Sequence, residues 1–106
     1  MLRITLMEHT PDEAILKVEG SISEEYVQVL EEEGNRWLGK TRSLALDLEG
    51  VRFIDHSGLA LLQSWSDRII LHGAQQFIHM LLEAYGLDSA VSTDTEDWFE
   101  MQASGS

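Results

Sequence analysis

The sequence predicts a single α/β domain with a four-stranded mixed sheet, in the order β-β-α-β-α-β-α, and with helices packed mainly on one face. Two observations lead to this class: strand-like and helix-like apolar periodicities alternate along the chain, and 43% of the 106 residues are apolar, which suits one packed core. The domain is expected to span residues 1–101, followed by a frayed tail at 102–106.

The N-terminal residues predict a β-hairpin. Apolar residues alternate over residues 2–7, which is the period of a strand that is buried on one face. Glu8–Glu13 contains the only proline of the chain and predicts a turn. A second alternating stretch covers Ala14–Gly20, and the short connection between the two stretches favours antiparallel pairing.

A helix is expected over about Glu24–Leu38, after a loop at Gly20–Ser23. Its apolar residues share one face at helical spacing. Either Ser21 or Ser23 is suitably placed to cap its first turn. Gly34 lies on the apolar face, where a glycine either permits close packing or marks a frayed turn.

A central strand is expected next, at Ser43–Glu49, because its residues are apolar on both faces. A helix precedes it, so this strand should run parallel to the strand before that helix. Glu49 and Gly50 predict a turn. Val51, Phe53 and Ile54 are then expected to be buried just before Asp55.

The remaining residues predict two further helices and a strand. One helix should run from after Ser57 to about Ser66, followed by a short buried strand over Arg68–His72. Gln75–Tyr85 shows the clearest helical pattern, with an apolar stripe that begins at Phe77 and a stop at Gly86. A last short helix is expected to carry Trp98 and Phe99.

Charge and composition limit the classes of function. The formal net charge of −12 disfavours direct binding to nucleic acid or to anionic lipid, and it either keeps the domain soluble or selects basic protein partners. The absence of cysteine excludes disulfides, thiolate metal sites and a cysteine nucleophile. Without a signal peptide or a long apolar run, the chain is expected to be cytoplasmic and not inserted in a membrane.

The junction between the central strand and the following helix is the candidate site. Asp55, His56, Ser57 and Gly58 stand where a buried strand gives way to a helix, so backbone amides and the positive end of the helix dipole are available there. Taken alone, the pattern predicts helix capping by Asp55 or Ser57, with Gly58 allowing a tight turn.

These residues also carry a family resemblance. Residues 44–62, LALDLEGVRFIDHSGLALL, resemble the core signature of STAS domains, the family of bacterial anti-sigma-factor antagonists and their relatives. In that signature an apolar strand ends in an Asp-x-Ser-Gly-Leu turn that opens a helix. Residues 14–23, AILKVEGSIS, resemble the second strand of the family, and residues 69–88, IILHGAQQFIHMLLEAYGLD, resemble its fourth strand and third helix. Most of the chain is covered.

The resemblance implies a non-enzymatic regulator of transcription, with no catalytic residue, cofactor or metal. In the antagonists, a partner that is both kinase and anti-sigma factor phosphorylates the serine of the turn, and only the unphosphorylated domain binds it. The matching serine is Ser57. The implied partner surface contains the following residues: Ser23, Asp55, His56, Ser57, Gly58 and Leu59.

Two other classes of function stay open. One is a STAS subunit that works without phosphorylation and docks on a transporter ATPase or a sensor complex. The least favoured is a small enzyme using Ser57, because no base and oxyanion arrangement accompanies this serine in the sequence. The four histidines are scattered along the chain and predict no metal site.

The chain departs from the family pattern at three places. Ser23 stands where the family usually has an acidic or amide residue. His56 stands where it usually has a small hydroxylated one, so it is either an exposed turn residue or a group that senses the phosphate. The run Gly58–Ile69 is short, so Ser64–Arg68 must connect a helix of about two turns to the next strand. We expect a monomer, and the alternative is a domain-swapped or other homodimer.

Overall fold

The computed structural model describes residues 1–92 and forms one four-stranded sheet from them. The strands lie in the order β1 (Leu2–His9), β2 (Glu13–Ile22), β3 (Ser43–Ile54) and β4 (Ile69–His72). β1 pairs antiparallel with β2, whereas β3 pairs parallel with both β2 and β4. The mixed sheet and its central third strand are therefore as the sequence predicts.

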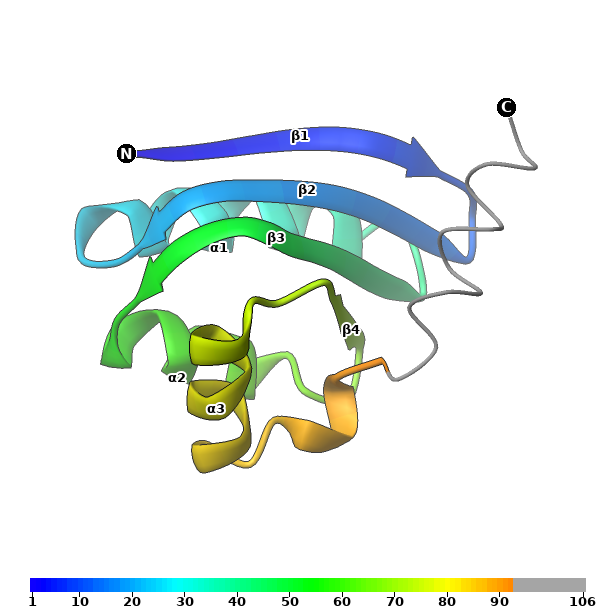
Figure 1. Ribbon diagram of the computed structural model, residues 1–106. Coiled ribbons are helices and arrows are strands. Elements are labelled where there is room, and N and C mark those ends of the chain that lie inside the picture. Colours follow the sequence, from blue (N-terminus) through cyan, green and yellow to red (C-terminus); the bar gives the residue numbers. More distant parts are fainter. Residues whose placement is uncertain (93–106) are drawn as a thin grey trace.

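Helices connect the parallel strands and follow the last one. They are α1 (Glu25–Leu38), α2 (His56–Ser64) and α3 (Gln76–Ala84), and a short 3-10 helix, η1 (Asp88–Ala90), comes after α3. Figure 1 shows α1 behind β2 and β3, and α2 and α3 below β3. Within residues 1–92 no helix has the length and apolar character to cross a membrane. The predicted helix with Trp98 and Phe99, and the tail at 102–106, lie outside the described residues.

One hydrophobic core joins the helices to a single face of the sheet. Leu16, Leu46 and Leu71 are neighbours in register on three adjacent strands, and each is fully buried. The three helices cover them with Leu30, Leu62 and Leu82, which are also fully buried. Burial of a leucine side chain contributes roughly 1.5–3 kcal/mol, so this core holds α2 and its first turn firmly against the sheet.

The expected turn at Glu49 and Gly50 is wrong, because β3 runs unbroken through both residues. The pairing of β2 with β3 shifts register twice along this stretch, which is how the longer strand is accommodated. A Cβ on Gly50 would lie 2.8 Å from Cγ of Glu19, so this glycine serves close strand packing. Near the end of β3, Phe53 is 48% exposed, although its place in an apolar stretch predicts burial.

The start of α1 also differs from the prediction. β2 continues to Ile22, and neither Ser21 nor Ser23 caps the helix. The N-cap is Glu24, whose side chain makes no capping hydrogen bond and whose φ is 48°. Residues other than glycine rarely adopt positive φ, and holding one there costs about 1–3 kcal/mol.

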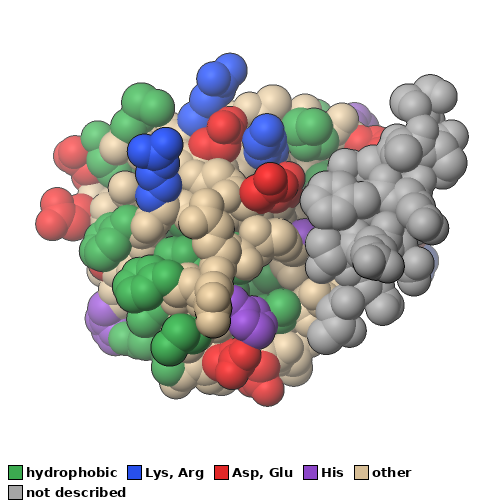
Figure 2. Space-filling view, viewed as in Figure 1, with side chains coloured by type: hydrophobic (Ala, Val, Ile, Leu, Met, Phe, Trp, Pro, Cys, Tyr) green, Lys and Arg blue, Asp and Glu red, His purple; other side chains and the backbone are tan. Residues whose placement is uncertain are grey.

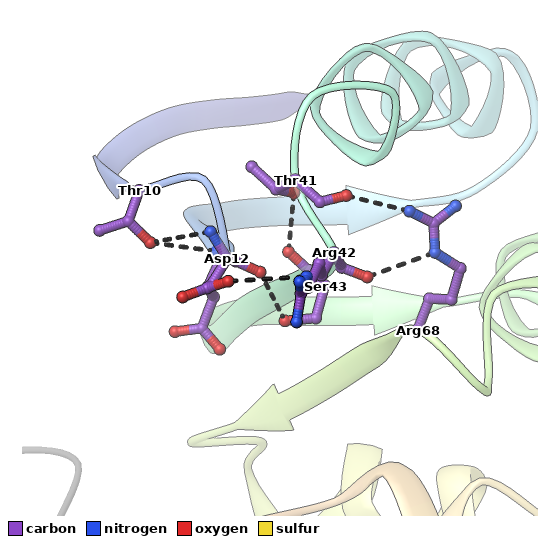
Figure 3. Close-up of polar contacts among 7 residues, drawn as sticks. Thr10, Asp12, Thr41, Arg42, Ser43 and Arg68 are labelled. Carbon is purple, nitrogen blue, oxygen red and sulfur yellow. Dashed lines mark hydrogen bonds and ion pairs between the residues drawn. The ribbon is translucent and has the colours of Figure 1, made fainter.

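The short run after α2 closes within one chain. α2 has nine residues, and hydrogen-bonded turns at Trp65 and Arg68 lead directly into β4. Arg68 then fixes the neighbouring loop, because its guanidinium donates to the carbonyl oxygens of Leu38 (2.7 Å), Thr41 (3.0 Å) and Arg42 (3.3 Å). Figure 3 shows Arg68 facing this loop. The described residues therefore complete the sheet without strand exchange, and the monomer favoured by the sequence stays a prediction.

Candidate functional site

The turn from Asp55 to Gly58 begins α2 at the end of β3. Asp55 is the N-cap residue, and its Oδ1 accepts a hydrogen bond from the backbone N–H of Gly58 at 2.9 Å. The backbone N–H of Asp55 in turn donates to the carbonyl oxygen of Ile22 at 3.1 Å. Of the two capping residues that the sequence allows, the structure selects Asp55.

Asp55 also joins two loops that are distant in sequence. Its Oδ2 accepts a hydrogen bond from the backbone N–H of Glu24 at 3.0 Å. Hydrogen bonds from backbone amides, first that of Gly58 and then those of Glu24 and Ser57, lower the pKa of Asp55 although partial burial opposes them. The carboxylate therefore fastens the strained Glu24 loop to the first turn of α2.

Removing the Asp55 carboxylate is expected to lower stability by an amount that depends on pH. We expect Asp55→Ala to lower the free energy of unfolding by about 1–2 kcal/mol at pH 7, through loss of the cap and of the bond to Glu24. Because folding lowers the pKa of Asp55, its contribution is complete above the unfolded value of about 3.9 and disappears as pH falls through the folded value. Urea unfolding at pH 7 and pH 3 measures the difference.

A matched control for this experiment is Asp12→Ala. The side chain of Asp12 is 79% exposed and its carboxylate lies 3.7 Å from Arg42, an exposed pair that contributes little. This variant should stay within about 0.5 kcal/mol of wild type at both pH values. A difference between wild type and Asp55→Ala that is the same at pH 7 and pH 3 would contradict the role given to the Asp55 carboxylate.

Gly58 lets α2 approach the sheet closely. A Cβ at this position would lie 2.6 Å from the carbonyl oxygen of Ile22 and 2.8 Å from side-chain carbons of Ile22 and Ile54. Gly58 is buried and Leu59 is only 2% exposed, within the core. Gly58 and Leu59, which the family resemblance places on the partner surface, are therefore buried and support the turn from beneath.

Ser57 is the exposed hydroxyl of this turn. It is the second residue of α2, so its side chain stands at the positive end of the helix dipole. Among residues 1–92 its hydroxyl has no hydrogen-bond partner, because Asp55 performs the capping. The side chain is thus available for modification or contact at no cost to the helix cap.

His56 is exposed and contacts Tyr85, the residue that follows α3. Its Nδ1 lies 3.1 Å from the hydroxyl oxygen of Tyr85, and the two ring centroids are 5.9 Å apart. Gln63 donates from Nε2 to the backbone carbonyl of Tyr85 at 2.6 Å, which ties α2 and the end of α3 together again. Ser23, on the loop beside the turn, is half-buried and its carbonyl oxygen accepts from the N–H of Tyr26 at 3.0 Å.

Sequence reasoning missed two residues at this site, Glu24 and Tyr85. Nothing in the sequence marks Glu24, because positive φ is expected of glycine or asparagine. Tyr85 fits the apolar stripe of its helix, and only its hydroxyl hints at a polar partner.

In the described part of the chain, the other titratable groups do not gather into a second site. Within residues 1–92, no cluster of three or more histidine, aspartate or glutamate side chains suits a metal ion. His9 packs against Trp37 with ring centroids 4.8 Å apart, and His79 lies 3.2 Å from Glu83. His72 is 5% exposed, and this burial lowers its pKa.

Comparisons with known proteins identify the family and the fold. A family model described as "Mlab, STAS domain" matches residues 5–93. No curated protein matches the chain in sequence.

Three solved structures share the fold at low sequence identity. An anti-sigma factor antagonist from Mycobacterium paratuberculosis aligns with a TM-score of 0.78 and 16% identity, over 95% of this chain and 93% of its own. The Bacillus cell fate determinant SpoIIAA in its phosphorylated form aligns with 0.68 and 16%, over 93% and 99%. The STAS domain of a SulP transporter from Vibrio cholerae aligns with 0.57 and 15%, over 92% and 88%. The predicted fold class is confirmed.

Proposed function

The chain belongs to the STAS domain family, and from that membership we propose that it is a protein-binding switch of the anti-sigma-factor antagonist type, controlled by phosphorylation of Ser57. The main observation behind the proposal is that the hydroxyl of Ser57, on the first turn of α2, is exposed and does not cap the helix. The likeness to an antagonist from Mycobacterium paratuberculosis and to phosphorylated SpoIIAA supports it. On this proposal the chain is a cytoplasmic bacterial regulator without catalytic activity.

Electrostatics explains how one phosphate would act as a switch. Phosphorylation adds about −1.5 to −2 charges, and the start of α2 stabilises an anion by roughly 0.3–1 kcal/mol, so the domain itself tolerates the group. A partner packed against the turn would have to desolvate that phosphate and lose its contact with the serine. Asp55 stands two residues away with its carboxylate already engaged by backbone amides, so it keeps its negative charge beside the phosphate. The partner surface consists of Ser23, Asp55, His56 and Ser57, supported by Gly58 and Leu59.

The proposal is tested with the full chain and a purified candidate kinase of the anti-sigma class, chosen by gene neighbourhood. We expect Mg-ATP and the kinase to add one phosphate, which mass spectrometry places on Ser57 and which Ser57→Ala abolishes. Ser57→Asp should weaken binding to the kinase by about 100-fold or more, equivalent to about 2.7 kcal/mol. Ser64→Asp is the matched control, because Ser64 is exposed on the same helix, away from the turn, and should leave binding within about threefold.

The second candidate is a STAS subunit that docks on a transporter ATPase without phosphorylation, and the likeness to a SulP transporter domain favours it. It predicts that Ser57→Ala and Ser57→Asp both bind the partner as wild type does. That result would reject the phosphorylation switch. Co-purification with a transporter ATPase would then support the docking subunit.

A further inference from the structure

Three large apolar side chains are exposed on β3, which leads into the turn, and on α3, whose following residue Tyr85 contacts the turn. Phe53 is 48% exposed, Phe77 is 60% exposed and Met80 is 62% exposed. Phe53 stands two residues before Asp55, while Phe77 and Met80 are one turn apart on α3 and face away from buried Ile78. Figure 2 shows hydrophobic side chains gathered over the end of β3 and over α3. We call Phe53, Phe77 and Met80 the apolar patch.

The sequence pattern predicts that Phe53 and Phe77 are buried, but both are exposed in the structure. Phe77 opens the stripe that predicts the buried face of α3, yet Ile78 and Leu82 alone form the buried positions of this helix. Phe53 points away from the core because a register shift with β2 separates it from Val51. Large apolar side chains that stay exposed together commonly mark an interaction surface.

The patch is mechanically joined to the turn. The hydroxyl of Tyr85, just after α3, lies 3.1 Å from Nδ1 of His56, and Gln63 of α2 bonds the carbonyl of Tyr85. A partner seated on the turn would therefore meet α3 in a fixed position beside it. One partner can therefore contact both the turn and α3.

The charges around the patch decide its occupant. Glu24 and Glu25 are exposed at the start of α1 and Glu83 is exposed on α3, so the acidic residues outnumber Arg52, the exposed cation that precedes Phe53. A second copy of this chain would bring the same acidic residues and the same net charge of −12 against them. A basic surface would instead be attracted, and charged residues at the rim of an interface set partner choice and association rate.

We propose that the apolar patch binds the partner protein of the turn, through a partner surface with an apolar centre and a basic rim. This inference rests on the proposed function in placing a partner at the turn. It adds the site on α3 and the chemistry of the partner. The two aromatic rings and Met80 supply the contact area, and the acidic rim supplies orientation.

Site-specific photo-crosslinking in cells tests the surface. Benzoylphenylalanine replaces Phe77, or Ala60 on the exposed side of α2 beside the turn, or Met7, which is 50% exposed on β1 and serves as control. We expect positions 77 and 60 to crosslink the same protein and position 7 to leave it unlinked. That protein, once identified by mass spectrometry and purified, is the probe for the binding measurements.

Binding of the purified protein to the full chain then tests the chemistry. Phe77→Ser and Met80→Ser should each weaken binding by about tenfold or more, as expected for central interface residues, whereas Met7→Ser should stay within about twofold. Raising salt from about 50 to 200 mM should weaken binding, because screening weakens the attraction of a basic rim. Unchanged melting temperatures of these variants show that the fold is kept.

The remaining outcomes separate the two proposals. If position 60 crosslinks a protein and position 77 does not, the apolar patch is not part of the partner surface. The proposed function of the turn would still stand in that case. Crosslinking at position 77 alone would reject a partner at the turn, and with it a partner surface shared by the turn and α3. Crosslinking of position 77 only to a second copy, or tighter binding at high salt, would overturn the basic partner.

Discussion

Replacing Gly58 with alanine is expected to lower the free energy of unfolding by about 2–4 kcal/mol. Alanine is ordinarily favoured over glycine in a helix by about 1 kcal/mol, so the loss must come from packing. The added Cβ would lie 2.6 Å from the carbonyl oxygen of Ile22, which is backbone and cannot rotate away. The first turn of α2 must therefore move off the sheet. Urea unfolding monitored by circular dichroism measures the change.

The same displacement should affect function before it unfolds the domain. A shift of the first turn lengthens the bond from Gly58 N–H to Asp55 and disturbs the bond from Glu24 N–H to the same carboxylate. The position of Ser57 then changes relative to the rest of the surface. We expect folded Gly58→Ala to bind the partner at least about tenfold more weakly than wild type, since interface contacts depend on close packing.

Gly39→Ala is the control for this prediction. Gly39 follows α1 with φ of −76°, and a Cβ there would come no closer than 3.4 Å to a neighbouring atom. Its stability should stay within about 0.5 kcal/mol of wild type, because the backbone conformation suits alanine. Equal stabilities of the two variants would show that α2 does not depend on a glycine against Ile22.

The elements of this fold are predictable where local sequence decides them. The alternation in β1 and β2, the periodicity of α1 and α3, and the glycines that follow these two helices all act within a few residues, and the structure follows them. Gly73 and Gly86 adopt positive φ at the ends of β4 and α3, as stop positions require. The Asp-x-Ser-Gly turn belongs to this class as well, since its cap spans three residues.

What could not be predicted depends on contacts between distant residues. The bond between Glu24 and Asp55 joins positions 31 apart, and the contact between His56 and Tyr85 joins positions 29 apart. The carbonyl oxygens that Arg68 binds belong to the end of α1 and the loop after it, which precede Arg68 by a whole strand and helix. Phe77 matches a buried stripe in sequence, yet the position of α3 on the sheet leaves it outside. Only the packed fold determines these features.

The contact between Gly34 and Trp65 is also one between distant residues, and a double substitution can test it. A Cβ on Gly34 would lie 2.2 Å from Cη2 of Trp65, whose indole is 8% exposed and donates from Nε1 to Oδ1 of Asn35 at 3.1 Å. Of the two interpretations that the sequence allows for this glycine, the structure selects close packing. We expect Gly34→Ala to lower the free energy of unfolding by about 1–3 kcal/mol despite its higher helix propensity.

The second substitution, Trp65→Phe, separates overpacking from any other effect of Gly34→Ala. The smaller ring lacks the atoms that the new Cβ would meet, at the cost of the bond to Asn35 and of some buried area. If the indole is the cause, the double variant should be more stable than the sum of the single effects predicts, by about 1 kcal/mol or more. Additive effects in urea unfolding would contradict this account. The packing of α1 on Trp65, the C-cap residue of α2, would then be looser than the structure has it.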